Sequence, residues 1–421
     1  MPVDREELGR RIRVAREARG LTQDDVAQHL GVSRPTVAQM ELGNRAVTSL
    51  ELDQLARLFG RDLREFVADA FQEQDALSAL FRAEEAVIQQ PHVIDALRNC
   101  ATLGREVTNL EQLLGIDREG VAAAVYPSPI PRSRWQAVQQ GERVASQERR
   151  RLGLGLAPVG SLSELLETQG VRTALIDLPD DVSGLTMADL AIGVFIVANR
   201  THHAVRRRFS LAHEYAHALL DRDRLGTVSR TTERNDLVEV RANTFAAAFL
   251  LPGEGVRQFM TLIGKGGPSR QHADIFDEGG VVEASTRAAP KSQDTQMYDV
   301  AELAEHFGVS RLAALYRLRN LRFLSDAEFD HLKQLEDAGQ GRAVAALLQL
   351  PQRDEDAARD EYRHRFLSLA LEAFRRQAIS RSKLNELASI IDLGPNEVGD
   401  LLERIGLVDT GASPDVLVPA E

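Results

Sequence analysis

The feature that most constrains this chain is an apolar stretch that carries two histidines and a glutamate, RFSLAHEYAHALLD at residues 208–221. On a helix, His213 and His217 at positions i and i+4 share one face, where both imidazoles can hold one zinc ion. Glu214 then lies beside the open coordination position. Zinc lowers the pKa of a water that it binds to about 7, and a neighbouring carboxylate can take that water's proton. The pattern therefore predicts a zinc-dependent hydrolytic site on a buried helix.

A third metal ligand is expected on a following helix. In LVEVRANTFAAAFLLP, Glu239 precedes an Ala- and Phe-rich run, and Asn243, four residues later, could hydrogen-bond a ligating imidazole. Glu239 is favoured because it lies on an apolar, helix-forming segment, whereas its rivals lie in polar turn sequence. Those rivals are Asp221, Asp223, Glu233 and Asp236.

These two segments together resemble the ImmA/IrrE family of bacterial metallopeptidases, most closely over residues 155–260. In that family, HExxH is followed by an acidic residue and an Ala-Asp/Asn-x-Phe-Ala segment on a second helix. The resemblance implies zinc as cofactor, His213, His217 and Glu239 as ligands, and Glu214 as general base. Two departures are visible: Arg241 replaces a second acidic residue, and Tyr215-Ala216 replaces Leu-Gly inside the motif.

The amino-terminal sequence LTQDDVAQHLGVSRPTVAQMELGNR predicts two short helices joined by a tight turn. Thr22 can cap the first helix, Gly31 ends it, and Ser33 can cap the second. This order is typical of a helix-turn-helix, and residues 6–67 resemble the XRE repressor family. The resemblance implies binding to double-stranded operator DNA, with Gln23 at a phosphate-contacting position. The candidate DNA contacts are Gln23, Ser33, Arg34, Thr36, Gln39, Asn44 and Arg45.

Charge restricts where DNA could bind. The whole chain has a formal net charge of −12, so a DNA contact must come from a local patch. Between Arg10 and Arg45 there are seven arginines and four acidic residues, which places such a patch on the helix-turn-helix. We expect a homodimer on an inverted repeat, because one small helix-turn-helix contacts few bases.

Composition points to a reducing compartment. Cys100 is the only cysteine, so no intramolecular disulfide can form. No apolar run reaches the length of a membrane span, and the charged amino terminus is unlike a signal peptide. We therefore expect a cytoplasmic protein with no membrane partner.

An internal repeat appears in the second half of the chain. AELAEHFGVSR at residues 301–311 matches DDVAQHLGVSR at residues 24–34, so a second helix-turn-helix-like unit is expected. The helix after this repeat, LAALYRLRNLRFL, is apolar with scattered arginines. We expect it to pack against the body and not to read bases.

The expected fold is mainly α, multidomain, with a small α+β zincin-like domain. A helical linker follows the helix-turn-helix, and its part between Phe71 and Leu114 is a possible dimerisation element. Further along the chain, a polar stretch that contains His272, Asp274 and Asp277 predicts a mobile loop. The expected divisions are 1–70 (helix-turn-helix), 71–130 (linker), 131–265 (zincin-like), 266–297 (loop), 298–345 (helix-turn-helix-like) and 355–421 (C-terminal helices).

Two functions are consistent with these patterns. The first is a DNA-binding transcriptional regulator coupled to a zinc-dependent endopeptidase that cleaves a repressor or antitoxin-like protein in a stress or mobile-element response. The substrate class comes from the resemblance alone. The alternative is a transcription factor whose zincin-like domain senses a metal or ligand and cleaves nothing. The intact HEYAH favours the peptidase, because purely structural zinc sites usually have four protein ligands and no such glutamate.

Overall fold

The structure is a computed structural model of the 421-residue chain. Its helices and strands confirm the expected class: a mainly helical, multidomain protein with one small mixed sheet in the body. Among its described residues, no helix has the length and apolar character needed to cross a membrane. The described residues are 3–59, 61, 63–68, 91–116, 124–189, 193–221, 226–230, 236–265, 270–277, 280–287, 292–350, 357–391 and 393–407.

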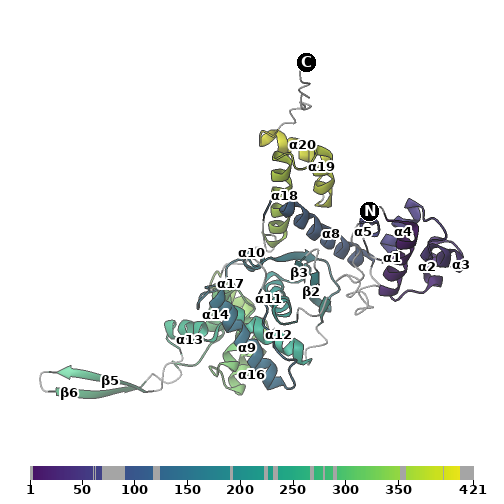
Figure 1. Ribbon diagram of the computed structural model, residues 1–421. Helices are drawn as coiled ribbons and strands as arrows, with labels where there is room; N and C mark the ends of the chain where they lie inside the picture. Colours follow the sequence, from purple (N-terminus) through teal and green to yellow (C-terminus); the bar gives the residue numbers. More distant parts are fainter. Residues whose placement is uncertain are drawn as a thin grey trace.

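The head is a five-helix unit with its own core (Figure 1). Thr22 and Asp25 form a capping box, Gly31 ends the first helix of the pair in the left-handed conformation, and Ser33 precedes the second helix. The predicted helix-turn-helix is therefore present. Its helices are α1 (Arg5–Ala18), α2 (Gln23–Leu30), α3 (Arg34–Glu41), α4 (Ser49–Phe59) and α5 (Leu63–Val67).

A four-stranded sheet with the order β1-β3-β2-β4 forms the centre of the body. The central strand β3 pairs with β1 in parallel and with β2 in antiparallel orientation, and β4 pairs antiparallel with the other side of β2. The strands are β1 (Val171–Ile176), β2 (Val182–Asp189), β3 (Gly193–Asn199) and β4 (Gly226–Arg230).

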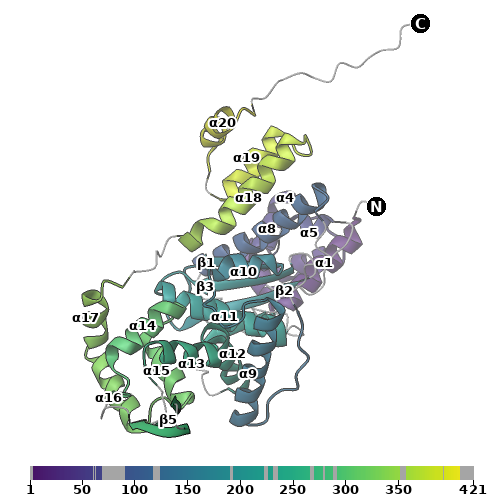
Figure 2. The same cartoon turned by 90° about the vertical axis from the view of Figure 1, so that its left-hand side faces the viewer.

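The sheet is buried on both faces because β3 alternates its side chains between two cores. Ile196 packs on one side with the helices α9 (Arg134–Arg151), α11 (Ala204–Leu220) and α12 (Leu237–Leu250). Phe195 packs on the other side with α8 (Pro91–Leu113) and α18 (Ala357–Arg375) (Figure 2). The sheet therefore holds α11 and α12 on one face, and the short α10 (Leu162–Thr168) leads into β1.

The apolar face of α8 is used within the chain. Leu97 and Leu110 are buried among residues of the sheet, α18 and α19 (Arg381–Ile390). The sequence predicted a possible dimerisation element between Phe71 and Leu114, and within α8 the apolar residues Leu97 and Leu110 are covered by this chain and not by a partner copy. An amphipathic pattern shows that a face must be covered but does not identify the cover. Residues 71–90 of the predicted element lie outside the described part of the chain.

The second helix-turn-helix-like unit follows the zincin-like part. Gly308 adopts φ 64° and ψ 47°, close to the φ 66° and ψ 30° of Gly31, and Ser310 caps the next helix as Ser33 precedes α3. Arg317 is buried and donates to Glu142 and to the carbonyl of Leu251, so this helix packs against the body, as expected. The unit contains α14 (Met297–Phe307), α15 (Arg311–Asn320), α16 (Asp326–Asp337) and α17 (Gln340–Leu347), and α13 (Gly253–Leu262) precedes it.

The stretch expected to be a mobile polar loop contains an antiparallel hairpin. Strand β5 (Arg270–Asp277) pairs with β6 (Gly280–Arg287). The loop prediction relied on the polar composition and missed the Ile-Phe and Val-Val pairs on either side of Glu-Gly-Gly, a local signal for a hairpin. The C-terminal helices α18, α19 and α20 (Pro395–Arg404) follow.

Candidate metal centre

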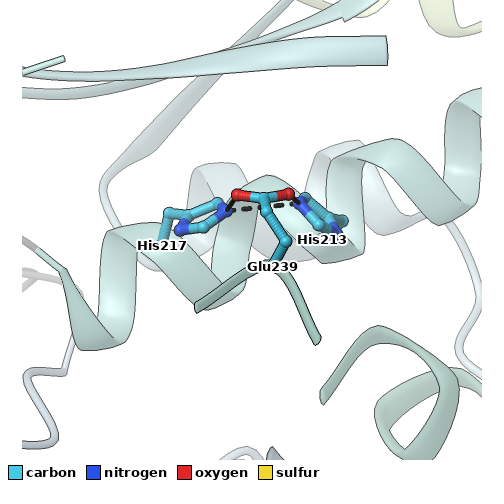
Figure 3. Close-up of side chains that lie close together, drawn as sticks. All are labelled: His213, His217 and Glu239. Carbon is cyan, nitrogen blue, oxygen red and sulfur yellow. Dashed lines mark hydrogen bonds and ion pairs between the residues drawn. The ribbon is translucent and has the colours of Figure 1, made fainter. Parts of the chain in front are cut away.

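Three buried side chains from two helices meet beneath the sheet (Figure 3). His213 and His217 come from consecutive turns of α11, and Glu239 reaches them from the first turn of α12. The two Nε2 atoms lie 3.2 Å apart. Glu239 Oε2 is 3.1 Å from Nε2 of His213, and Glu239 Oε1 is 3.3 Å from Nε2 of His217. The structure thus brings together the three residues that the sequence predicted as ligands.

The donor set and its spacing fit a zinc ion. Tetrahedral zinc with bonds of about 2.0–2.1 Å has neighbouring ligand atoms about 3.3 Å apart, close to the separations of these three donors. Two imidazoles and one carboxylate leave the fourth position of a tetrahedron for a water or a substrate, which is the arrangement of catalytic zinc sites.

Within the cluster, carboxylates stabilise the protonated form of an imidazole. Burial opposes a charge on His217, but its hydrogen bonds to Asp221 and Glu239 outweigh that effect and raise its pKa from 6.5 to about 10. Burial likewise opposes the charge of Glu239, yet its bonds to His213 and His217 hold its pKa well below the ordinary value. The site is therefore preorganised for positive charge.

Each imidazole is oriented by an acceptor on its other nitrogen. Nδ1 of His213 lies 3.1 Å from Oδ1 of Asn243, and Nδ1 of His217 lies 3.0 Å from Oδ2 of Asp221. Such bonds fix the ring orientation and leave Nε2 for the metal. Asn243 thus lies at the outer nitrogen of one imidazole, and Asp221, weighed in the sequence as a ligand, lies at the outer nitrogen of the other.

Of the other rival ligands, Asp236 alone lies within the described residues. Asp236 is the N-cap of α12, and its carboxylate accepts from the main-chain N–H of Val238. Asp223 and Glu233 fall outside the described residues. Within the described part of the chain, the three residues of Figure 3 form the group that could hold a metal ion.

Arg241 has a structural reason to depart from the family pattern. Its side chain is 1% exposed, and its guanidinium donates to Asp221 Oδ1 at 2.5 Å. Its main-chain oxygen packs so closely on α9 that a Cβ at Gly141 would lie 2.6 Å from it. A cation at this position therefore neutralises the carboxylate that orients His217, a role that local sequence could not reveal.

Tyr215, the other departure, anchors α11 to α9. Its ring is buried against Phe245 and Phe249, and its hydroxyl donates to Glu148. Glu148 also accepts from Tyr126 at 2.8 Å. Burial, reinforced by the charge of Glu148, raises the pKa of Tyr215. The phenol thus provides a buried hydrogen bond that the leucine of the family pattern could not.

Glu214 projects from α11 toward strand β2 and is fully buried. Its Oε2 accepts a hydrogen bond of 2.7 Å from the hydroxyl of Thr186. Sequence reasoning missed Thr186, because a threonine in a strand is ordinary and nothing local links it to a helix that begins after β3. It adjoins the residue that the sequence singled out as general base.

The predicted DNA contacts differ in exposure and in their partners within the head. Arg34 is 63% exposed at the start of α3, with a carboxylate oxygen of Asp24 at 3.8 Å. Gln23 donates to Glu41 at 2.9 Å, and Arg45 donates to Glu51 at 2.8 Å, so both have partners within the head. The remaining candidates form two surface pairs, Ser33 with Thr36 at 2.9 Å and Asn44 with Gln39 at 3.0 Å.

Fold and site together define a class, a DNA-binding regulator that carries a protease-like domain, and comparison with known families agrees. Residues 7–67 match a family model described as a helix-turn-helix domain. Residues 166–265 match a family model described as an IrrE N-terminal-like domain. The two matches follow the order that the sequence suggested, a helix-turn-helix domain followed by an IrrE-like domain.

Comparison with individual proteins adds no functional argument. Among curated proteins, none matches this chain significantly. One solved structure that it resembles is ComR from Streptococcus suis, with 13% identity over 92% of this chain and 94% of that chain. The TM-score of 0.15 is too low for this likeness to carry any conclusion.

Proposed function

We propose that the protein is a zinc-dependent endopeptidase joined to an operator-binding head. The observation that carries the proposal is the buried triangle of His213, His217 and Glu239 with Glu214 on the adjoining helical position. Structural zinc sites are closed by four protein ligands and have no need of an adjacent carboxylate. Three ligands and a neighbouring glutamate are the composition of a hydrolytic site.

The residues divide the chemistry among them. When bound, zinc supplies a Lewis acid that polarises the scissile carbonyl and acidifies water. His213, His217 and Glu239 would hold it, with Asn243 and Asp221 fixing the imidazole rings. Glu214 accepts a proton from the attacking water and returns it to the departing amine. The peptide C–N bond therefore breaks to give a carboxyl group and an amine.

The head supplies the second activity. Its helix-turn-helix presents the exposed Arg34 and Gln39 on α3, and we propose that two heads bind an inverted-repeat operator. The dimer contact is not assigned to α8, whose apolar face is covered within the chain. A repressor or antitoxin-like protein encoded near this gene is the proposed substrate, and the cytoplasm is the proposed location.

The sensor function makes a different prediction from the same site. A metal or ligand sensor would bind zinc and change operator affinity, yet would cleave no partner. The test is to purify the chain with zinc and incubate it with each protein encoded beside its gene, alongside Glu214→Gln. Cleavage by the wild type alone, with one zinc per chain in both proteins, supports the peptidase. Zinc with no cleavage by either protein would favour the sensor, and absence of zinc would refute both the peptidase and a zinc sensor.

A further inference from the structure

Strand β2 passes over Glu214 and contacts it through a hydroxyl. Thr186 is buried, and its Oγ1 lies 2.7 Å from Glu214 Oε2 and 3.0 Å from the main-chain oxygen of Glu214. A hydroxyl has one proton to donate. The shorter distance and the negative charge assign that proton to the carboxylate, which makes this a buried, charge-assisted hydrogen bond.

A second residue of the same strand makes room for that carboxylate. A Cβ at Gly184 would lie 3.0 Å from Cγ and 3.1 Å from Oε1 of Glu214, and 2.7 Å from the carbonyl oxygen of Val197. Gly184 and Thr186 are two positions apart, so they face the same side of the strand. One therefore leaves the space that Glu214 fills, and the other holds the group that fills it.

We infer that Thr186 is a positioning residue for Glu214, and that Gly184 makes space for the carboxylate that Thr186 holds. This inference rests on the proposed peptidase function, because Thr186 acts only through the general base. A glutamate side chain has several rotamers, whereas proton transfer requires its oxygen within hydrogen-bond reach of the water in one geometry. The bond from β2 selects one orientation before substrate arrives, which is preorganisation in the ordinary sense.

The test removes the hydroxyl and keeps the shape. Thr186→Val replaces the hydroxyl with a methyl group, and Thr186→Ser keeps it. Acetohydroxamic acid serves as the probe, because a hydroxamate chelates zinc and donates a hydrogen bond to a neighbouring carboxylate. Titration calorimetry of the full chain loaded with zinc should show about tenfold weaker probe binding for Thr186→Val, the order expected for one charge-assisted bond. Thr186→Ser should stay within about threefold of wild type, with zinc content equal in all three.

Matched controls separate positioning from a general effect on the sheet. Thr173 is a buried threonine on β1, which β3 separates from β2, so Thr173→Val should leave probe binding unchanged. In a Glu214→Gln background, Thr186→Val should cause no further loss, because the group that it positions is already gone. If circular dichroism shows that Thr186→Val does not fold, Thr186→Ala is used in its place and is compared with Thr186→Ser.

The outcomes distinguish this inference from the proposed function. If Glu214→Gln weakens the probe but Thr186→Val, or its alanine substitute, binds like wild type, Thr186 is not a positioning residue and the peptidase proposal stands. The same conclusion follows if Thr186→Ser binds the probe as weakly as Thr186→Val. It also follows if Thr186→Val weakens probe binding further in the Glu214→Gln background. If wild type holds no zinc, or Glu214→Gln leaves probe binding unchanged, the peptidase proposal itself is overturned.

Discussion

Arg241 and Asp221 form a buried ion pair, with the guanidinium Nη2 2.5 Å from the carboxylate Oδ1, at the point where α12 crosses the end of α11. The other oxygen of Asp221 faces Nδ1 of His217. The residue that departs most from the family pattern thus lies two contacts from the metal position. A cation there limits the negative charge around the site, since Asp221 and Glu239 both lie next to His217.

Arg241→Met should weaken zinc binding about tenfold to a hundredfold, because the orienting carboxylate loses its partner. Competition with a chromophoric chelator measures the change. Arg257→Met is the matched control, since Arg257 lies on α13 in an exposed pair with Glu254 and should have no effect. Equal zinc affinity in both variants would show that Arg241 serves packing alone.

Glu239→Gln should reduce zinc content from one ion per chain to nearly none after dialysis, because the neutral amide is a poor ligand and no longer balances the metal charge. The control is Glu254→Gln, at a carboxylate that is 73% exposed. Elemental analysis of the two purified variants decides the point. Full zinc content in the Glu239 variant would exclude this residue as a ligand.

Zinc should stabilise the protein more as the pH rises from about 6.5 toward 10. In the metal-free chain the raised pKa of His217 means that its protonated form is stabilised by folding. This contribution is complete below about pH 6.5 and is lost as the pH rises through about 10. Zinc requires the neutral imidazole, so its binding competes with that proton. Thermal melts with zinc and with a chelator, at pH 6.5, 7.5 and 8.5 (roughly the lower part of this titration), measure the effect. The difference between the two melting temperatures should grow with pH. A difference that stays constant would contradict the raised pKa of His217.

Arg34→Ala should weaken binding to a duplex taken from the region upstream of the gene and lower the salt dependence by about one counterion. Arg311→Ala is the matched control, because Arg311 occupies the corresponding position in the second helix-turn-helix-like unit, where it pairs with Glu336. Fluorescence anisotropy at several salt concentrations measures both quantities. Equal losses in the two variants would place DNA on the body as well as the head.

Gly141→Ala should destabilise the body by about 1–3 kcal/mol, because its methyl group would meet the main chain of α12 at 2.6 Å from the Arg241 oxygen. Gly160→Ala should be close to neutral, since a Cβ there would lie in open space among the described residues. Urea unfolding of the two variants tests the close approach of α9 and α12. Similar midpoints would show that the helices separate at little cost.

The sequence predicted those features that depend on local spacing. The positions of His213 and His217 follow from helical periodicity, and both helix-turn-helix units follow from cap and turn residues such as Gly31 and Gly308. The family comparison confirms the two domains, while the roles of the individual ligands remain predictions. These features can be predicted because the residues that form them are close in the sequence as well as in space.

Features that join distant segments were not predictable in this way. Thr186 meets Glu214 only because β2 folds over α11, and Asp221 could be told from a ligand only once Arg241 lay beside it. The cover of α8 was likewise hidden, since it comes from helices near the other end of the chain. A single sequence does not show which distant segments pack together. An apolar pattern on a helix can be covered by any of several elements, and only tertiary packing decides which one covers it.

The arrangement around the sheet has a consequence for synthesis of the protein. One face of the sheet is completed by α18, which begins more than a hundred residues after α12 has supplied Glu239. During translation the head, with its separate core, can fold early, but Phe195 and its neighbours have α8 and not α18 as cover until the ribosome has released α18. A chain cut short by premature termination would therefore retain a head able to engage DNA beside an unfinished, aggregation-prone body.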